Sequence, residues 1–268
     1  GASIQGLFRN PLADQTLIGV SSGAMLFAVV AIMLFGTALA EYSAFLHQSA
    51  VSIAAFIGGV VTTYTVYLLS QKHGRTSVMT MLLAGIAISA FAAAITGIFV
   101  YLSDNQQLRD ITFWTMGSVG GASWKQVIIV FPVVFLGTYF LDRHAKALNS
   151  IMLGEREAMY LGVPVEKVKS RIILLTALIV GVCISMSGLI GFVGLIIPHL
   201  LRLIKGSDYR YLLRSSALVG ALFLVMADTL ARTIIAPAEL PIGILTAIVG
   251  APFFLWLLVQ QRRSAYAI

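Results

Sequence analysis

Long apolar stretches separated by short polar ones dominate this chain and limit what it can fold into. They lie at about 16–40, 47–70, 77–102, 124–141, 170–188, 189–204, 213–235 and 241–259. A membrane-spanning helix needs ~20 apolar residues. Barrel strands would instead alternate over ~10 residues, and because the sequence shows no such alternation, helices are the other way to satisfy the backbone in lipid. We predict an all-α polytopic membrane protein with about eight transmembrane helices.

The composition excludes soluble classes of protein. Hydrophobic residues make up 59% of the 268 residues and charged residues only 11%, whereas soluble domains carry about 25% charged residues. The net charge of +7 comes from too few charges to form a surface that tracks phosphates, so no nucleic-acid partner is expected. Membrane lipid is the expected surrounding.

The distribution of basic residues predicts the orientation. When the connection at 71–75 is placed in the cytoplasm, 15 of the 18 lysines and arginines fall on that side, and only Arg109, Lys125 and Arg232 fall outside. Cytoplasmic connections carry the excess of Lys and Arg. We therefore expect a multi-pass protein of the bacterial inner (cytoplasmic) membrane with a cytoplasmic C-terminus.

The motifs of catalysis are missing from the sequence. It contains no phosphate-binding G-x-x-x-x-G-K-[ST] loop and no histidine or cysteine spacing typical of a metal site. We predict no catalytic residue, no metal site and no cofactor in this chain, so ATP and Mg²⁺ would be bound by a partner. His199 follows Pro198 inside an apolar stretch; haem or metal ligation is conceivable there, and a histidine bonded to neighbouring backbone is the favoured interpretation.

Several apolar stretches contain residues that interrupt helices. Gly188 ends one stretch, Gly191 and Pro198 fall within the next, and Pro241 and Gly243 open the last one. Glycine weakens a helix and proline breaks one, so we predict structural breaks at these five positions. Broken helices are typical of transport pathways.

Asp228 and Arg232 are ionisable residues inside an apolar stretch. Their i, i+4 spacing places them on one helix face, where they can pair. Such residues are costly in lipid and are candidates for function. A structural ion pair at the end of a span fits them equally well.

The longest polar segment is 142–169. Within it, Gly154–Gly162 carries charged and then apolar residues and is followed by Pro164, which is typical of a short amphipathic helix outside the bilayer. We interpret 142–169 as a cytoplasmic loop with short helices that form a docking surface. The alternative is a helix that rests on lipid, but two acids and one base suit lipid poorly.

Five stretches in order resemble the FecCD-type permeases, which are the membrane subunits of ABC importers for ferric siderophores, haem and cobalamin. The stretches are GASIQGLFRNPLADQTLIGVSSGA, LGEREAMYLGV, SGLIGFVGLIIPHLLRL, ADTLART with PAELPIG, and TAIVGAPFFLWLL. The resemblance implies a cobalamin-importer-type (type II) permease fold of ten helices. It also implies that 1–268 is a single transmembrane domain that lacks the family's first helix and much of the second.

The resemblance also implies partners and site residues. The partners would be a second copy of the chain, two cytoplasmic ABC ATPases and a periplasmic or lipid-anchored substrate-binding protein. The residues expected to couple the chain to the ATPase are Gly154, Glu155, Glu157, Ala158, Leu161 and Gly162. The residues expected at the gate are Asn10, Pro11, Leu12, Thr76 and Ser77. Arg232 would dock the binding protein, because its guanidinium can bind a carboxylate with two hydrogen bonds.

The substrate follows from two segments that are similar to those of haem importers in the family, 72–77 and 104–124. The predicted function is therefore the transmembrane permease of an ATP-driven haem importer. A ferric siderophore or cobalamin in the same role is the first alternative. An ion-driven secondary transporter, for which Asp228 is the carboxylate candidate, and a haem-binding membrane enzyme are the others.

Overall fold

The computed structural model describes residues 1–35, 44–72, 74–235 and 238–265. The described part is helical except for one two-stranded hairpin, which confirms the predicted all-α class. The elements in chain order are α1 Ala2–Leu7, the 3₁₀ helix η1 Gln15–Ile18, α2 Val20–Phe35, α3 Ala44–Ser70, β1 Gln71–Lys72, β2 Arg75–Thr76, α4 Val78–Leu102, α5 Asn105–Met116, α6 Trp124–Arg143, α7 Ala145–Leu153, α8 Glu155–Tyr160, α9 Val165–Ser187, α10 Val193–Lys205, α11 Tyr209–Ile234 and α12 Ile242–Ala265.

Five of the described helices are long and apolar enough to cross a membrane. They are Ser49–Ser70, Val78–Leu102, Trp124–Arg143, Val165–Ser187 and Tyr209–Ile234. The stretch predicted as a span at 189–204 forms α10, whose 13 residues extend only ~20 Å and cannot cross a core of about 30 Å alone. The predicted count of eight complete spans is therefore not confirmed. The end of the predicted span 16–40 and the C-terminus fall outside the described residues.

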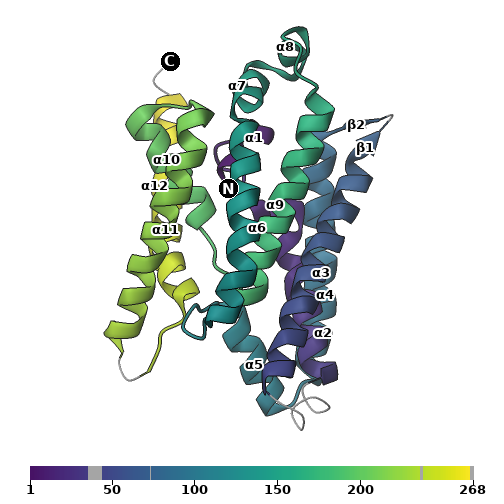
Figure 1. Ribbon diagram of the computed structural model, residues 1–268, viewed down its shortest axis with the longest axis vertical. Coiled ribbons are helices and arrows are strands. Elements are labelled where there is room, and N and C mark those ends of the chain that lie inside the picture. The colour runs from purple at the N-terminus through teal and green to yellow at the C-terminus, as the bar shows by residue number, and fades with distance from the viewer. Residues whose placement is uncertain (36–43, 73, 236–237, 266–268) are drawn as a thin grey trace.

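The helices form three groups around the short helix α1 (Figure 1). α2, α3 and α4 pack together on one side, α10, α11 and α12 lie on the other, and α6 and α9 stand between them. The hairpin, α7 and α8 lie at one end of the bundle, and α5 lies at the opposite end. This arrangement separates two surfaces that the sequence assigns to opposite sides of the membrane.

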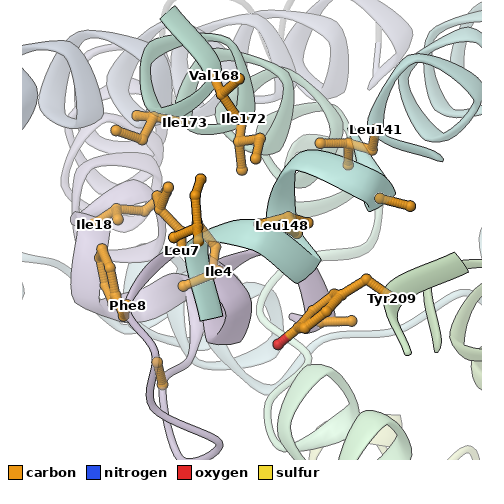
Figure 2. Close-up of a cluster of buried hydrophobic side chains, with 14 of the residues drawn as sticks. Ile4, Leu7, Phe8, Ile18, Leu141, Leu148, Val168, Ile172, Ile173 and Tyr209 are labelled. Carbon is orange, nitrogen blue, oxygen red and sulfur yellow. The ribbon is translucent and has the colours of Figure 1, made fainter. Parts of the chain in front are cut away.

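The core lies near the end that carries α7 and α8. All six residues of α1 are buried, and Figure 2 shows Ile4 and Leu7 of this helix beside Leu148 of α7, Ile172 of α9 and the ring of Tyr209. Lipid is as apolar as these side chains, so burying them gains little from the hydrophobic effect. Such helices are held together by close packing. α1 thus joins α7 and α9 to α10 and α11 from the inside.

Glycines bring α2 and α3 into backbone contact. A methyl group added at Gly23 would collide with the Gly58 carbonyl and Thr62, and one added at Gly58 would collide with the Gly23 carbonyl. Small residues at a helix interface allow this approach in membranes. The pair therefore fixes the two helices against each other.

The predicted helix breaks fall at three kinds of position. Gly188 ends α9 with φ +68° and ψ −161°, and Gly191 lies in the gap before α10. Pro241 directly precedes α12, and Gly243 is the second residue of that helix. Gly243 therefore does not interrupt a helix. A Cβ at this position would collide with the Met116 carbonyl, so the glycine permits close packing.

The predicted break at Pro198 is wrong, because this proline lies inside a helix. α10 runs through it from Val193 to Lys205. A proline within a helix lacks the N–H that would bond the carbonyl four residues earlier, here that of Gly194. The Gln5 amide donates to that carbonyl at 3.4 Å, so α1 supplies the donor that the proline lacks.

Candidate functional site

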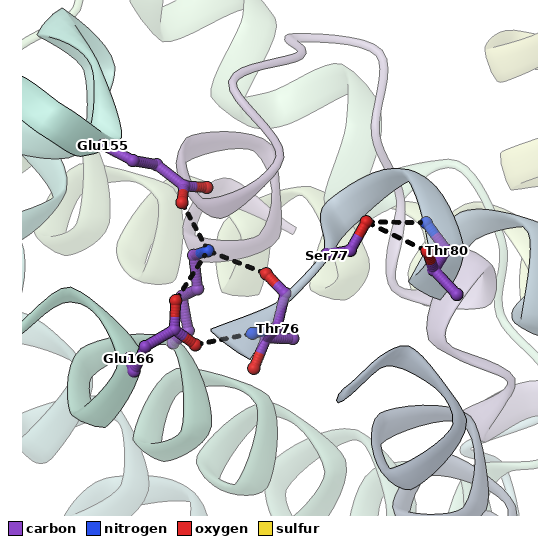
Figure 3. Close-up of polar contacts among 6 residues, drawn as sticks. Thr76, Ser77, Thr80, Glu155 and Glu166 are labelled. Atoms are coloured by element: carbon purple, nitrogen blue, oxygen red, sulfur yellow. Dashed lines mark hydrogen bonds and ion pairs between the residues drawn. The ribbon is translucent and has the colours of Figure 1, made fainter. Parts of the chain in front are cut away.

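The predicted coupling segment and the predicted gate turn meet at one buried lysine. The Lys169 ammonium, on the first turns of α9, lies 2.7 Å from a carboxylate oxygen of Glu155 in α8. It also donates to the carbonyl of Thr76 in β2 at 2.9 Å (Figure 3). The side chain of Lys169 is only 1% exposed. A buried charge must be paired in this way, because desolvation of an ammonium is costly.

Glu166 completes the cluster from the same helix as Lys169. One of its oxygens lies 3.3 Å from the Lys169 ammonium, and the other accepts a hydrogen bond from the backbone N–H of Thr76 at 2.7 Å. Both backbone polar groups of Thr76 are thus held by side chains of α9. Ser77 follows as the N-cap of α4 and accepts from the Thr80 N–H at 3.3 Å, so the cluster fixes the start of α4.

A cavity of about 320 Å³, lined mainly by charged residues, opens between α8 and the hairpin. Lys72 and Arg75 line it from the hairpin, Arg156 and Met159 line it from α8, and Glu166 lines it from α9. The two elements therefore do not pack directly against each other along this cavity. Side chains from α9 bridge them.

The outer face of the coupling segment is exposed and partly apolar. Tyr160 is 89% exposed and Leu161 65%; Glu157 and Gly162 are also exposed. Ala158 faces inward and is fully buried. We call the exposed residues Glu157, Met159, Tyr160 and Leu161 the α8 patch. Large apolar side chains beside a charge, outside the spans, are typical of a protein interface.

Gly154 makes the sharp corner from α7 into α8. Its φ is +147°, a value that residues other than glycine rarely adopt. The Glu157 carboxylate folds back over Gly154. A carboxylate near a helix N-terminus is favourable. The corner thereby sets the angle at which the α8 patch projects.

α7 is attached to the other side of the bundle. The Asn149 Nδ2 donates to the Asp208 carboxylate at 2.8 Å, and the Tyr209 N–H donates to the Asn149 Oδ1 at 2.9 Å. The hydrogen bond from Asn149, followed by that from the Arg210 backbone N–H, lowers the pKa of Asp208 below its ordinary value. The Tyr209 hydroxyl accepts from Arg202 at 2.9 Å. The segment α7–α8 thus contacts α11 at one end and α9 with the hairpin at the other.

The second predicted gate segment lies outside this cluster. Leu12 N–H donates to the Asn10 side chain at 2.9 Å, which makes a local turn after α1. Asn10 is exposed, and Pro11 and Leu12 are half-buried. The structure brings Thr76 and Ser77 close to the coupling segment, whereas the hydrogen bond at Asn10 holds only its own turn.

The opposite end of the bundle carries the predicted docking arginine. Arg232 Nε lies 2.9 Å from the Asp228 carboxylate, which confirms the predicted i, i+4 pair. The Arg232 side chain is 41% exposed, so part of its guanidinium faces outward. Near this end Gly188 and Gly243 approach the carbonyls of Trp114 and Met116, which anchor the end of α5.

A largely apolar cavity of about 790 Å³ lies between α5, α6 and α9. Trp114, Gln126, Cys183 and Gly188 are among its lining residues. It is separate from the cavity beside α8, because the two share no lining residue.

Within the described ranges, no group of three or more His, Cys, Asp or Glu side chains could hold a metal ion. The His199 ring lies edge-on to Phe253, with 6.0 Å between ring centroids. Its Nδ1 has no hydrogen-bond partner among the described residues, so the favoured interpretation of a backbone-bonded histidine does not hold for that atom.

Lys169 and Glu166 are site residues that the sequence motifs do not indicate, since a lysine in a polar connection contributes to the excess of charge on the cytoplasmic side whether or not it is buried. A signal for its burial was present. Val165, Val168, Ile172 and Lys169 follow the i, i+3, i+4, i+7 spacing of one helix face, and all four are buried. A lysine on an apolar face requires a partner, which here comes from α8.

Comparison with known proteins agrees with this architecture. The FecCD transport family matches residues 1–260. The hemin transport system permease protein HmuU of Yersinia pestis is 45% identical over 271 residues, covering 98% of this chain and 78% of that protein. The cobalamin import system permease protein BtuC of Halobacterium salinarum is 41% identical over 265 residues, covering 99% and 69%.

A solved structure shows the same fold. It is an inward-facing conformation of a metal-chelate type ABC transporter, with 34% sequence identity and a TM-score of 0.86, covering 96% of this chain and 79% of that one. The fold and the site thus define a multi-span permease subunit of an ABC importer. The chain belongs to the FecCD transport family.

Proposed function

We propose that this chain forms the pathway by which an ABC importer moves haem across the bacterial inner membrane, with ATP hydrolysed in a separate subunit. The observation that carries the choice of haem is the 45% identity to a hemin permease over 98% of the chain. Cobalamin permeases of Halobacterium salinarum, Vibrio cholerae and Salmonella paratyphi are 38–41% identical.

The exposed face of α5 supports an amphiphilic substrate. Phe113 is 64% exposed and Leu108 42%, and Arg109 on the same helix is also exposed. A flat apolar ring with carboxylates would find both apolar contacts and a cation there. α5 lies at the end of the bundle opposite α8 (Figure 1), where a substrate would be received.

The α8 patch is proposed to dock the ATPase. It presents a charge and three apolar side chains, and α7–α8 is attached to both sides of the bundle through Asn149 and Glu155. A push on the patch would therefore reach α11 and α9 together. Two copies of the chain, each with one ATPase, would rock between outward and inward openings as the ATPases close and separate.

Arg232 is proposed to bind a carboxylate of the substrate-binding protein. Its pair with Asp228 holds the guanidinium at the outer end of α11, and exposed charge pairs steer partners more than they add affinity. Arg232→Ala should slow association of the binding protein. Arg210→Ala, at the other end of the same helix, should not.

Cobalamin in the same role is the second candidate, favoured by the relative at 41% identity. A secondary transporter has less support, because its candidate carboxylate, Asp228, is bound by Arg232 at 2.9 Å rather than open to a coupling ion.

The test of the substrate is uptake into liposomes that hold the permease and its ATPase, with hemin, cyanocobalamin and a ferric siderophore each supplied on the binding protein. We expect ATP-dependent accumulation of hemin and at least about tenfold less of the other two, the lower end of the discrimination that an apolar pocket achieves. Preferential uptake of cyanocobalamin or the siderophore would contradict the assignment of haem and leave the permease role intact.

A further inference from the structure

Three segments separated in the sequence meet at the Lys169 ammonium. Its acceptors are Glu155 of α8 at 2.7 Å, the Thr76 carbonyl of β2 at 2.9 Å and Glu166 of its own helix at 3.3 Å. A lysine has three N–H donors, so these contacts use its full capacity. The side chain is 1% exposed, and the low dielectric of a buried site strengthens such bonds.

The cavity beside the cluster shows why this one side chain matters. About 320 Å³ of open space separates α8 from the hairpin, so packing alone does not make them move together. In the described part of the chain, the polar path from α8 to β2 runs from Glu155 through Lys169 to Thr76. Beyond Thr76, Ser77 caps α4.

We propose that Lys169 is a positioning residue that makes α8 and β2 move as one body, so that displacement of α8 reaches the start of α4. This inference rests on the proposed function, since it requires an ATPase that moves α8. Lys169 touches neither ATP nor substrate in this role. Without Lys169, ATP is still hydrolysed but hydrolysis is uncoupled from transport.

The test compares four variants of the permease–ATPase complex in liposomes. Lys169→Met removes the three contacts, Lys169→Arg keeps a cation, and Glu155→Gln weakens only the contact with α8. Lys167→Ala is the matched control, because Lys167 lies two residues away on the same helix and is exposed. Two quantities are measured: ATP hydrolysed per hemin accumulated, and the distance distribution between spin labels at Arg156 and Lys72 in a Cys183→Ser background.

For Lys169→Met we expect the ATP consumed per hemin to rise about tenfold, a factor within the range by which one site typically affects another. We also expect the distribution of distances between the labels to broaden. Lys169→Arg should restore most of the coupling, Glu155→Gln should lie between, and Lys167→Ala should match the wild type. A wild-type ratio with narrow distances in Lys169→Met would overturn the proposal. If that variant does not assemble, the same result in Glu155→Gln overturns it.

The importer function and the Lys169 link are contradicted by different results. A wild-type complex that accumulates none of the supplied substrates with ATP contradicts the proposed function. The label distances, measured in the permease alone, still test the link, because broadening in Lys169→Met requires neither ATP nor substrate. Narrow distances in that measurement contradict the link itself.

Discussion

The Asn149 Oδ1 accepts a hydrogen bond from the backbone N–H of Tyr209 at 2.9 Å, across 60 residues of sequence. This bond attaches α7 to the first turn of α11, where the Tyr209 ring is fully buried. Together with the Glu155–Lys169 pair, it gives the α7–α8 segment two attachments, one on each side of the bundle.

Asn149→Ala should destabilise the protein. The variant leaves the Tyr209 N–H without its acceptor, and an unsatisfied buried donor costs about 1–3 kcal/mol. The measurement is the thermal midpoint in detergent. Asn105→Ala is the control, because Asn105 is exposed at the start of α5. Equal midpoints for the two variants would show that the Asn149 contact does not hold α7.

Asp208 predicts a dependence of stability on acid pH. Hydrogen bonds from Asn149 and the Arg210 N–H lower its pKa below the ordinary value of 3.8. A depressed folded pKa adds stability above the unfolded pKa, and that stability is lost as the pH falls through the folded pKa. Asp208→Asn should therefore remove part of the fall in thermal midpoint below about pH 4. Identical pH profiles for the variant and the wild type would contradict this.

Gly188 and Gly191 form a matched pair in the gap between α9 and α10. Gly188→Ala adds a methyl group that meets the Trp114 carbonyl, at φ +68°, in a region of backbone conformation that costs side chains about 1–3 kcal/mol. A methyl group at Gly191 meets nothing within 4 Å. We expect a lower thermal midpoint for Gly188→Ala only. An equal fall for Gly191→Ala would point to chain stiffening rather than collision.

Reversing the charge on the α8 patch should weaken ATPase binding. Glu157→Arg replaces an exposed carboxylate, and like charges across an interface cost enough to reduce affinity about tenfold or more. Binding of the purified ATPase in nanodiscs is the measurement. Glu239→Arg makes the same change in the exposed connection that lies against Gly120, remote from α8. If Glu157→Arg binds like this control, the patch does not face the ATPase.

The sequence predicted those features that depend on local pattern. Apolar length located the long helices such as Val78–Leu102, and i, i+4 spacing identified the Asp228–Arg232 pair, whose charged atoms lie 2.9 Å apart in the structure. The roles assigned to Thr76, Arg232 and the α8 patch stay predictions.

Contacts between distant segments could not be predicted in the same way. Lys169 and Thr76 are 93 residues apart, and the donor that allows Pro198 to sit inside α10 comes from Gln5, 189 residues before its acceptor. No periodicity within one helix encodes such a partner. It exists only once the helices have packed.

The energy source of transport separates an ABC importer from an ion-driven transporter. The measurement is hemin uptake into liposomes that carry the permease with or without its ATPase, supplied with ATP or with a proton or sodium gradient. We predict uptake only when the ATPase and ATP are both present. Uptake that follows an ion gradient without the ATPase would contradict an ABC import mechanism for this chain.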